Sequence, residues 1–167
     1  RYYSILEDTL VAFKISPFSP KRSKRRVTQK DKYLVFDIGV RNALLKIHKN
    51  ALSPNEMGPI FEQFVMLQII YFNRAHKKQW EISSYRTEGG AEVDIIVDTG
   101  DRYLAIECKS GHNINDSGFS GLKSFEEVAN KKVNKYVIYT GKNRQLLRNN
   151  ILAVPVKEFF LEEINKY

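Results

Sequence analysis

EVDIIVDTGDRYLAIECKS, residues 92 to 110, contains two alternating segments on either side of a short polar turn. The turn, Thr99 to Arg102, predicts an antiparallel hairpin. If Asp98 pairs with Tyr103, one side of the sheet carries the pairs Ile96 with Ala105, Asp94 with Glu107 and Glu92 with Lys109. The other side is expected to be wholly apolar, with Val93, Ile95, Val97, Leu104, Ile106 and Cys108. A slip of one residue would bury carboxylates, and even a neutral unpaired polar group costs about 2–7 kcal/mol to bury.

The predicted register places two carboxylates, Asp94 and Glu107, directly opposite one another. Like charges in this arrangement destabilise a ladder unless a positive charge lies between them, and a divalent cation is the obvious candidate. Lys109 follows Glu107 on the same face, roughly 6–7 Å along the strand. A solvated sheet face is the alternative interpretation. It would tend to pair opposite signs, so the opposed carboxylates favour a site.

Length and composition limit the class of protein. The 167 residues suit one domain with a small appendage, and the net charge of +8 with a pI near 9.5 favours nucleic acid as a partner. The single cysteine, Cys108, excludes internal disulfides and favours a reducing compartment, so we expect a cytoplasmic protein. No segment is apolar for long enough to cross a membrane. Since the chain begins at Arg1 and opens on a helical pattern, we expect a fragment of a longer protein, and the sequence leaves open whether it forms an oligomer.

Residues 1–50 are expected to form a small module, with a helix capped at Ser4, strands over 11–15, 27–29 and 33–36, and a helix over 37–48. A cationic run follows the first strand: Lys21, Arg22, Lys24, Arg25 and Arg26. It is either a solvated loop tip or a phosphate-contacting finger. Lys142 and Arg144, in the basic turn after the strand at 136–139, are the other predicted nucleic-acid contacts.

Residues 51–167 are expected to form the main domain. Gly58 and Pro59 open its strongest helix, with proline at the first helical position. Glu62 in that helix either complements the helix dipole or reaches towards Asp94 and Glu107. The remaining elements are a strand at 79–85, the hairpin, a helix at 120–130, a strand at 136–139, a strand at 151–154 and a helix at 156–165. The order is an αβββαβ core with a mixed central sheet.

This pattern resembles the PD-(D/E)XK nuclease superfamily, which has a restriction-endonuclease-like fold. The superfamily motif is a helix glutamate, an aspartate and then Glu-x-Lys on the next strand; here the residues are Glu62, Asp94, Glu107 and Lys109. A closer resemblance is to a domain found C-terminal to AAA+ ATPase modules in archaeal and bacterial proteins. It rests on GPIFEQFV at 58–65, YRT at 85–87, EVD at 92–94, IECKS at 106–110, YYSILEDTL at 2–10 and residues 32–45.

The resemblance implies a nuclease-like domain that binds DNA and hydrolyses phosphodiester bonds with Mg²⁺ or Mn²⁺. Asp94, Glu107 and the backbone carbonyl of Cys108 would be metal ligands, with Glu62 holding a water or a second metal. Lys109 would position the attacking water or stabilise the phosphorane.

Two alternatives stay open. Lys109 could instead form an ion pair with Glu92, and the domain could be a non-catalytic nucleic-acid-binding or protein-docking module that keeps the nuclease fold. The chain has no phosphate loop of the G-x-x-x-x-G-K-[ST] type, so ATP is expected only in the N-terminal ATPase region that the resemblance implies.

Overall fold

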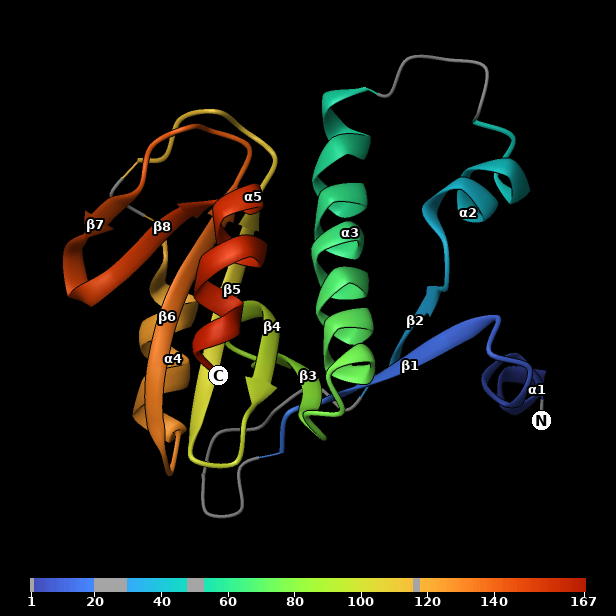
Figure 1. Ribbon diagram of the computed structural model, residues 1–167, viewed down its shortest axis with the longest axis horizontal. Coiled ribbons are helices and arrows are strands. Elements are labelled where there is room, and N and C mark those ends of the chain that lie inside the picture. Colours follow the sequence, from blue (N-terminus) through green and yellow to red (C-terminus); the bar gives the residue numbers. More distant parts are fainter. Residues whose placement is uncertain (1, 20–29, 48–52, 116–117) are drawn as a thin grey trace.

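Eight strands form one mixed sheet in the order β2-β1-β3-β4-β5-β6-β8-β7 in the computed structural model, which describes residues 2–19, 30–47, 53–115 and 118–167 (Figure 1). The strands are β1 (Ala12–Pro17), β2 (Lys32–Val35), β3 (Glu81–Arg86), β4 (Glu92–Asp98), β5 (Arg102–Lys109), β6 (Lys132–Tyr139), β7 (Gln145–Leu147) and β8 (Ile151–Pro155). The α-helices are α1 (Tyr2–Asp8), α2 (Ile38–Leu44), α3 (Pro54–Ala75), α4 (Ser120–Val128) and α5 (Val156–Glu158). Short helical turns are η1 (Arg148–Asn150), η2 (Phe159–Glu163) and η3 (Ile164–Lys166).

The hairpin of β4 and β5 has the predicted register where the two strands pair. The ladder runs from Asp98 opposite Tyr103 to Ile95 opposite Ile106. Within the described residues the ladder stops there, so the predicted pairs Asp94 with Glu107 and Glu92 with Lys109 are wrong as backbone pairs. Along the chain, the elements α3–β3–β4–β5–α4–β6 follow the predicted αβββαβ order, and β6 lies parallel to β5.

Both faces of the sheet are buried, which corrects the prediction of one polar face. The core on the α3 side contains Val65, Met66, Ile69, Ile95, Val97, Leu104, Ile106, Ile138 and Phe159. The core on the α4 side contains Val93, Ile96, Tyr103, Ala105, Leu122, Phe125 and Val137. In Figure 1, α4 lies behind β6 and α5 in front of it. Apolar side chains of β4 and β5 therefore pack into both cores, as is common where helices cover both sides of a sheet.

A β-bulge in β4 explains why Val93 lies in the α4-side core and not beside Ile95. Ser83 of β3 pairs with Ile96 and Tyr85 pairs with Val93, so one residue of β3 stands opposite both Asp94 and Ile95. Such a bulge shifts the alternation by one residue and re-aims the side chains beside it. The prediction that Val93 shares a face with Ile95 is wrong for this reason.

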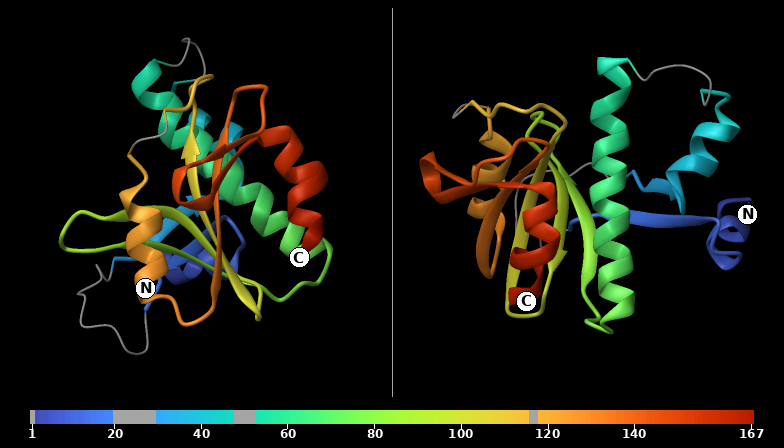
Figure 2. Two further views of the ribbon diagram at one scale, coloured as in Figure 1. Left: turned by 90° about the vertical axis from the view of Figure 1, so that its left-hand side faces the viewer. Right: turned by 45° about the horizontal axis from the view of Figure 1, so that its top comes forward.

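The N-terminal segment extends the sheet. β1 pairs antiparallel with β2 and parallel with β3, through Ser16 opposite Ser83 and Pro17 opposite Ser84. Figure 1 and the right-hand view of Figure 2 show α1 and α2 beyond α3, on the side away from β6 to β8. The predicted strand at 27–29 lies outside the described residues.

Several elements differ from the predictions; β6, for example, begins at Lys132 and not at Tyr136. α3 begins after Ser53, whose backbone N–H and hydroxyl both donate to the Glu56 carboxylate, so Pro59 lies inside the helix and does not open it. β7 was not predicted; its three residues pair antiparallel with β8 at the sheet edge. The predicted final helix is a single α-helical turn, α5, followed by the π-helical turn η2 and the 3₁₀ turn η3.

Candidate active site

The hairpin opens at the end that carries the charged residues. β5 stays paired with β6 through Glu107, Cys108 and Lys109, whereas β4 stays paired with β3 through Val93 and Glu92. The two strands therefore diverge beyond Ile95 and Ile106. Asp94 and Glu107 lie on either side of this fork.

Asp94 closes the fork with its side chain instead of its backbone. Its Oδ2 accepts a hydrogen bond of 2.7 Å from the backbone N–H of Cys108. The bulge at Asp94 and Ile95 makes this possible, because it frees Asp94 from the regular ladder. One carboxylate oxygen, Oδ1, is left for another ligand.

Glu107 and Lys109 form the second half of the site. Lys109 Nζ lies 2.8 Å from Glu107 Oε1, and the Glu107 side chain is only 16% exposed. The predicted ion pair between Lys109 and Glu92 is not among the ion pairs of the described residues. Glu92 instead lies 3.6 Å from Arg86 and 4.0 Å from Lys32.

Burial and mutual repulsion perturb the two carboxylates. Burial, followed by the charges of Glu107 and Glu62, raises the pKa of Asp94 to about 7, although the hydrogen bond from Cys108 opposes this. Burial, together with Glu92 and Glu62, also raises the pKa of Glu107 against the lowering effect of Lys109. Two buried carboxylates held close together in this way are typical of functional sites.

The two other groups at the fork stay protonated. Burial lowers the pKa of Lys109, but the hydrogen bond and charge of Glu107 and the charge of Asp94 outweigh it, so the pKa is raised. Burial raises the pKa of the Cys108 thiol well above its usual value, and the surrounding carboxylates add to the effect. Lys109 is therefore a cationic donor and not a base, and the Cys108 thiol is protonated.

Glu62 approaches the same group of charges from α3. Its Oε1 accepts a hydrogen bond of 2.9 Å from Lys32 Nζ, and its charge contributes to the raised pKa of both Asp94 and Glu107. All four motif residues, Glu62, Asp94, Glu107 and Lys109, thus belong to one electrostatic cluster. Lys32 was missed, and nothing marks it among the 27 Lys and Arg residues of the sequence.

The carboxylates of Asp94 and Glu107 fit a hard divalent cation that takes only a few of its ligands from the protein. In the part of the chain that the structure describes, no three His, Cys, Asp or Glu side chains are gathered closely enough to enclose a metal ion. Mg²⁺ is usually held by only one or two carboxylates, with waters and substrate phosphates completing its shell. Asp94 and Glu107 would hold it on these terms; a role for the Cys108 carbonyl stays a prediction.

The predicted nucleic-acid contacts have different surroundings. Lys142 is exposed. It follows Tyr139 by three residues, and Tyr139 pairs with Lys109, so Lys142 and Lys109 lie at the same end of the sheet. Arg144 forms ion pairs with Glu158, at 3.0 Å, and with the buried Glu163. The basic run at 21–26 lies outside the described residues.

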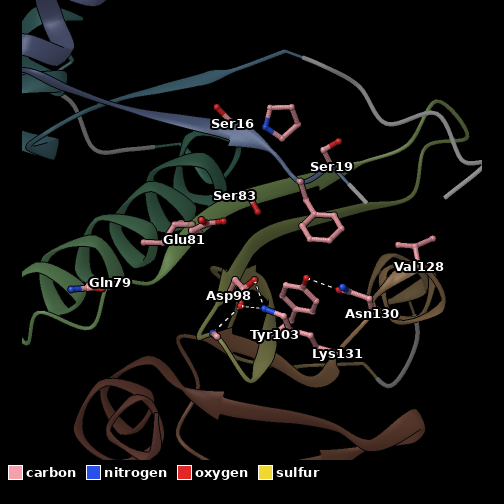
Figure 3. A pocket seen from close by; sticks show the side chains of 14 residues that line it. Ser16, Ser19, Gln79, Glu81, Ser83, Asp98, Tyr103, Val128, Asn130 and Lys131 are labelled. Atoms are coloured by element: carbon pink, nitrogen blue, oxygen red, sulfur yellow. Dashed lines mark hydrogen bonds and ion pairs between the residues drawn. The ribbon is translucent and has the colours of Figure 1, made fainter. Parts of the chain in front are cut away.

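A polar cavity of about 870 Å³ lies at the opposite end of the hairpin, between the end of β1, the start of β3, the turn after β4 and the start of β6 (Figure 3). Two of its charged groups, Asp98 and Lys131, form an ion pair with each other. Both carboxylate oxygens of Asp98 accept hydrogen bonds of 2.7 Å from Lys131, and the Tyr103 hydroxyl donates to Asn130 over 2.8 Å. The perturbed carboxylates at the fork are therefore the stronger candidate for chemistry.

Within the described residues, none of the helices combines the length and the apolarity that a membrane span requires.

Two family models match the chain. Residues 57–159 match the model described as a domain of unknown function, DUF4143, and residues 1–51 match another domain of unknown function, DUF8612. Domains of the DUF4143 type are often found C-terminal to AAA ATPase modules. No curated protein matches the chain.

Proposed function

Since this chain belongs to the DUF4143 family, we propose that it is a nuclease-like domain that serves an AAA+ ATPase, binds DNA and hydrolyses phosphodiester bonds with a divalent metal ion. ATP would bind to the ATPase module and not to this domain. The proposal extends the family assignment to a reaction and a substrate class.

The observation that carries the proposal is the fork between β4 and β5. It brings together two buried carboxylates, Asp94 and Glu107, and a protonated lysine, Lys109, whose Nζ is 2.8 Å from Glu107 Oε1. A structural ion pair needs one acid for one base. The additional acid, Asp94, is expensive to bury beside Glu107 unless a cation is bound there for part of the working cycle.

Each residue would contribute a distinct step. Asp94 and Glu107 would hold Mg²⁺, which would polarise the phosphoryl oxygen and make bound water more acidic. Lys109 would donate to the attacking water or to the phosphorane oxygens, where its charge is most useful in the transition state. The Cys108 N–H would keep Asp94 in one orientation through the 2.7 Å hydrogen bond.

Two further features support a nucleic-acid substrate. The net charge of +8 favours polyanions, and the exposed Lys142 lies at the same end of the sheet as Lys109. The order α3–β3–β4–β5–α4–β6 is that of the restriction-endonuclease-like core, which supports the same assignment.

The first test is a nicking assay on supercoiled plasmid DNA with Mg²⁺ or Mn²⁺. We expect cleavage by the wild-type chain to fall at least about 100-fold in Asp94→Asn, because the variant loses a metal ligand but keeps the acceptor for Cys108. The matched control is Asp98→Asn, on the same strand but at the other end of the hairpin, and it should retain cleavage. Cleavage that persists in EDTA, or that Asp94→Asn leaves unchanged, would contradict the proposal.

A second candidate function is protein docking without catalysis, and the N-terminal helices favour it. Tyr2, Leu10 and Leu44 are 84%, 60% and 68% exposed, and α1 and α2 bury none of their residues. Large exposed apolar side chains of this kind mark interaction surfaces. Binding of a partner protein with full affinity by Asp94→Asn, together with no metal binding by the wild type, would favour docking over hydrolysis.

A further inference from the structure

Lys32 brings a cation into the acidic cluster from outside the nuclease motif. It is the first residue of β2, in the segment that matches DUF8612, whereas the four motif residues lie in the segment that matches DUF4143. Its Nζ is 2.9 Å from Glu62 Oε1 and 4.0 Å from Glu92 Oε1. Asp94 is close enough to act on Lys32 electrostatically as well.

The sheet and α3 hold this lysine in position. Lys32 pairs with Ile15 of β1, and β1 is joined to β3 in the main sheet. At the other end of β2, the Gln63 side chain donates a hydrogen bond of 3.0 Å to the Val35 carbonyl. Since Gln63 follows Glu62 in α3, the same turn of helix that presents the carboxylate also fastens the strand that carries its partner.

With all four carboxylates ionised, the charges around the fork favour one divalent ion over two. Four carboxylates, Glu62, Glu92, Asp94 and Glu107, face three cations, Lys32, Arg86 and Lys109, so the cluster carries a net charge of −1. One Mg²⁺ would bring it to +1, whereas two would bring it to +3. Two-metal sites hold their ions about 3.5–4 Å apart, and a second ion beside Asp94 and Glu107 would have to share Glu62 with the Lys32 ammonium group.

We propose that the Lys32 ammonium group takes the place of a second divalent ion beside Glu62, so that the site binds a single metal ion, at Asp94 and Glu107. This inference rests on the proposed function. Glu62 then anchors Lys32 and is not a metal ligand, and the N-terminal hairpin determines the metal stoichiometry of a site whose other residues come from the main domain. The mechanism would then use one metal ion together with Lys32 and Lys109, and not two metal ions.

The test counts Mn²⁺ ions by calorimetry and by electron paramagnetic resonance, so it does not depend on cleavage. We expect the wild-type chain to bind one Mn²⁺ and Lys32→Met to bind two, with the spin–spin coupling of a close metal pair. Adding Glu62→Gln to Lys32→Met should return the count to one. The matched control is Lys14→Met, which removes another ion pair of the same hairpin, Lys14 with Asp31 at 3.1 Å, and should leave the count at one.

The outcomes separate the two proposals. Two ions in the wild type, or one ion bound by Lys32→Met at wild-type affinity, would overturn the inference and leave the proposed nuclease function intact. No ion in the wild type would overturn both. If Lys32→Met does not fold, Lys32→Gln takes its place, because glutamine keeps a donor for Glu62 but removes the charge, and it should also bind two ions.

Discussion

At the scale of single residues, Asp94 is a strongly perturbed acid of the site. Burial and the charges of Glu107 and Glu62 raise its pKa to about 7 from a usual value near 3.8. A difference of this size corresponds to roughly 4 kcal/mol at 1.36 kcal/mol per pKa unit, as an upper estimate for two interacting acids. The ionised form of Asp94 therefore weakens the fold, which is a common property of functional residues.

The pH dependence of stability follows from the sign of this difference. Between about pH 4 and pH 7 the folded chain holds the Asp94 proton and the unfolded chain has lost it, so the free energy of unfolding falls as the pH rises. Asparagine resembles the protonated acid and does not titrate. We therefore expect Asp94→Asn to be more stable than the wild type at pH 8, by about 1–4 kcal/mol, and nearly equal to it at pH 4 in urea unfolding.

Two controls accompany this prediction. Asp98→Asn breaks the ion pair with Lys131 and should give no gain in stability at pH 8. Saturating Mg²⁺ at pH 8 should stabilise the wild type by about 2.7 kcal/mol at 100 times its Kd and leave Asp94→Asn unchanged. A constant difference between Asp94→Asn and the wild type from pH 4 to pH 8 would show that Asp94 is not strained in its ionised form.

At the scale of elements, α4 lies so close to the start of β4 that only glycine fits at their contact. A Cβ atom on Gly121 would lie 1.7 Å from the carbonyl oxygen of Glu92, the first residue of β4. The helix approaches the strand two residues before Asp94. The position of the fork therefore depends on this contact between backbones.

We expect Gly121→Ala to push α4 away from β4 and to lower the free energy of unfolding by about 1–3 kcal/mol or more. Because Glu92 must shift with the strand, the affinity for Mn²⁺ should also fall. Gly58→Ala in α3 is the matched control: its Cβ would meet nothing within 4 Å, and alanine should stabilise the helix by about 0.5–1 kcal/mol. Thermal unfolding of the two variants checks both signs, and equal melting temperatures would contradict the argument.

At the scale of the whole molecule, the N-terminal hairpin is a lightly attached extension of the sheet. In the part of the chain that the structure describes, two residue pairs, Ser16 with Ser83 and Pro17 with Ser84, join β1 to β3, whereas β5 and β6 pair along eight residues. The four residues of β2 are all partly exposed. Because Lys32 begins β2, the metal stoichiometry proposed above depends on one of the less firmly held parts of the sheet.

Hydrogen exchange should reveal this difference in local stability. We expect backbone amides of β1 and β2 to exchange at least about 100-fold faster than those of β5 and β6, since a short ladder joins the hairpin to the rest of the sheet, even though Phe13 and Ile15 contribute to the α3-side core. Mass spectrometry of peptides from residues 12–17, 32–35, 102–109 and 132–139 would measure the rates. Equal protection of both regions would instead place the hairpin in the same cooperative unit as the central strands.

The sequence predicted which residues form the candidate site but not which side chains they contact. Glu62, Asp94, Glu107 and Lys109 come together as expected in one cluster of charges. Of the two alternatives for Lys109, the ion pair with Glu92 is not formed, because Lys109 contacts Glu107. The ion pairs of Arg144 with Glu158 and Glu163 were not predicted. Side-chain partners far apart in the sequence leave no periodic signal, because they depend on how separate elements pack.

The sequence alone determined the order of the elements from α3 to β6 and the register of the central hairpin from Asp98 and Tyr103 to Ile95 and Ile106. Alternating side chains and a short polar turn are local features, and a shift of one residue would bury charges, so one register wins. Tertiary structure alone decided the bulge at Asp94, the second core beneath α4 and the arrival of Lys32 beside Glu62. These depend on how separate strands and helices pack, and Lys32 and Glu62 are 30 residues apart, so packing and not local pattern selects the contact.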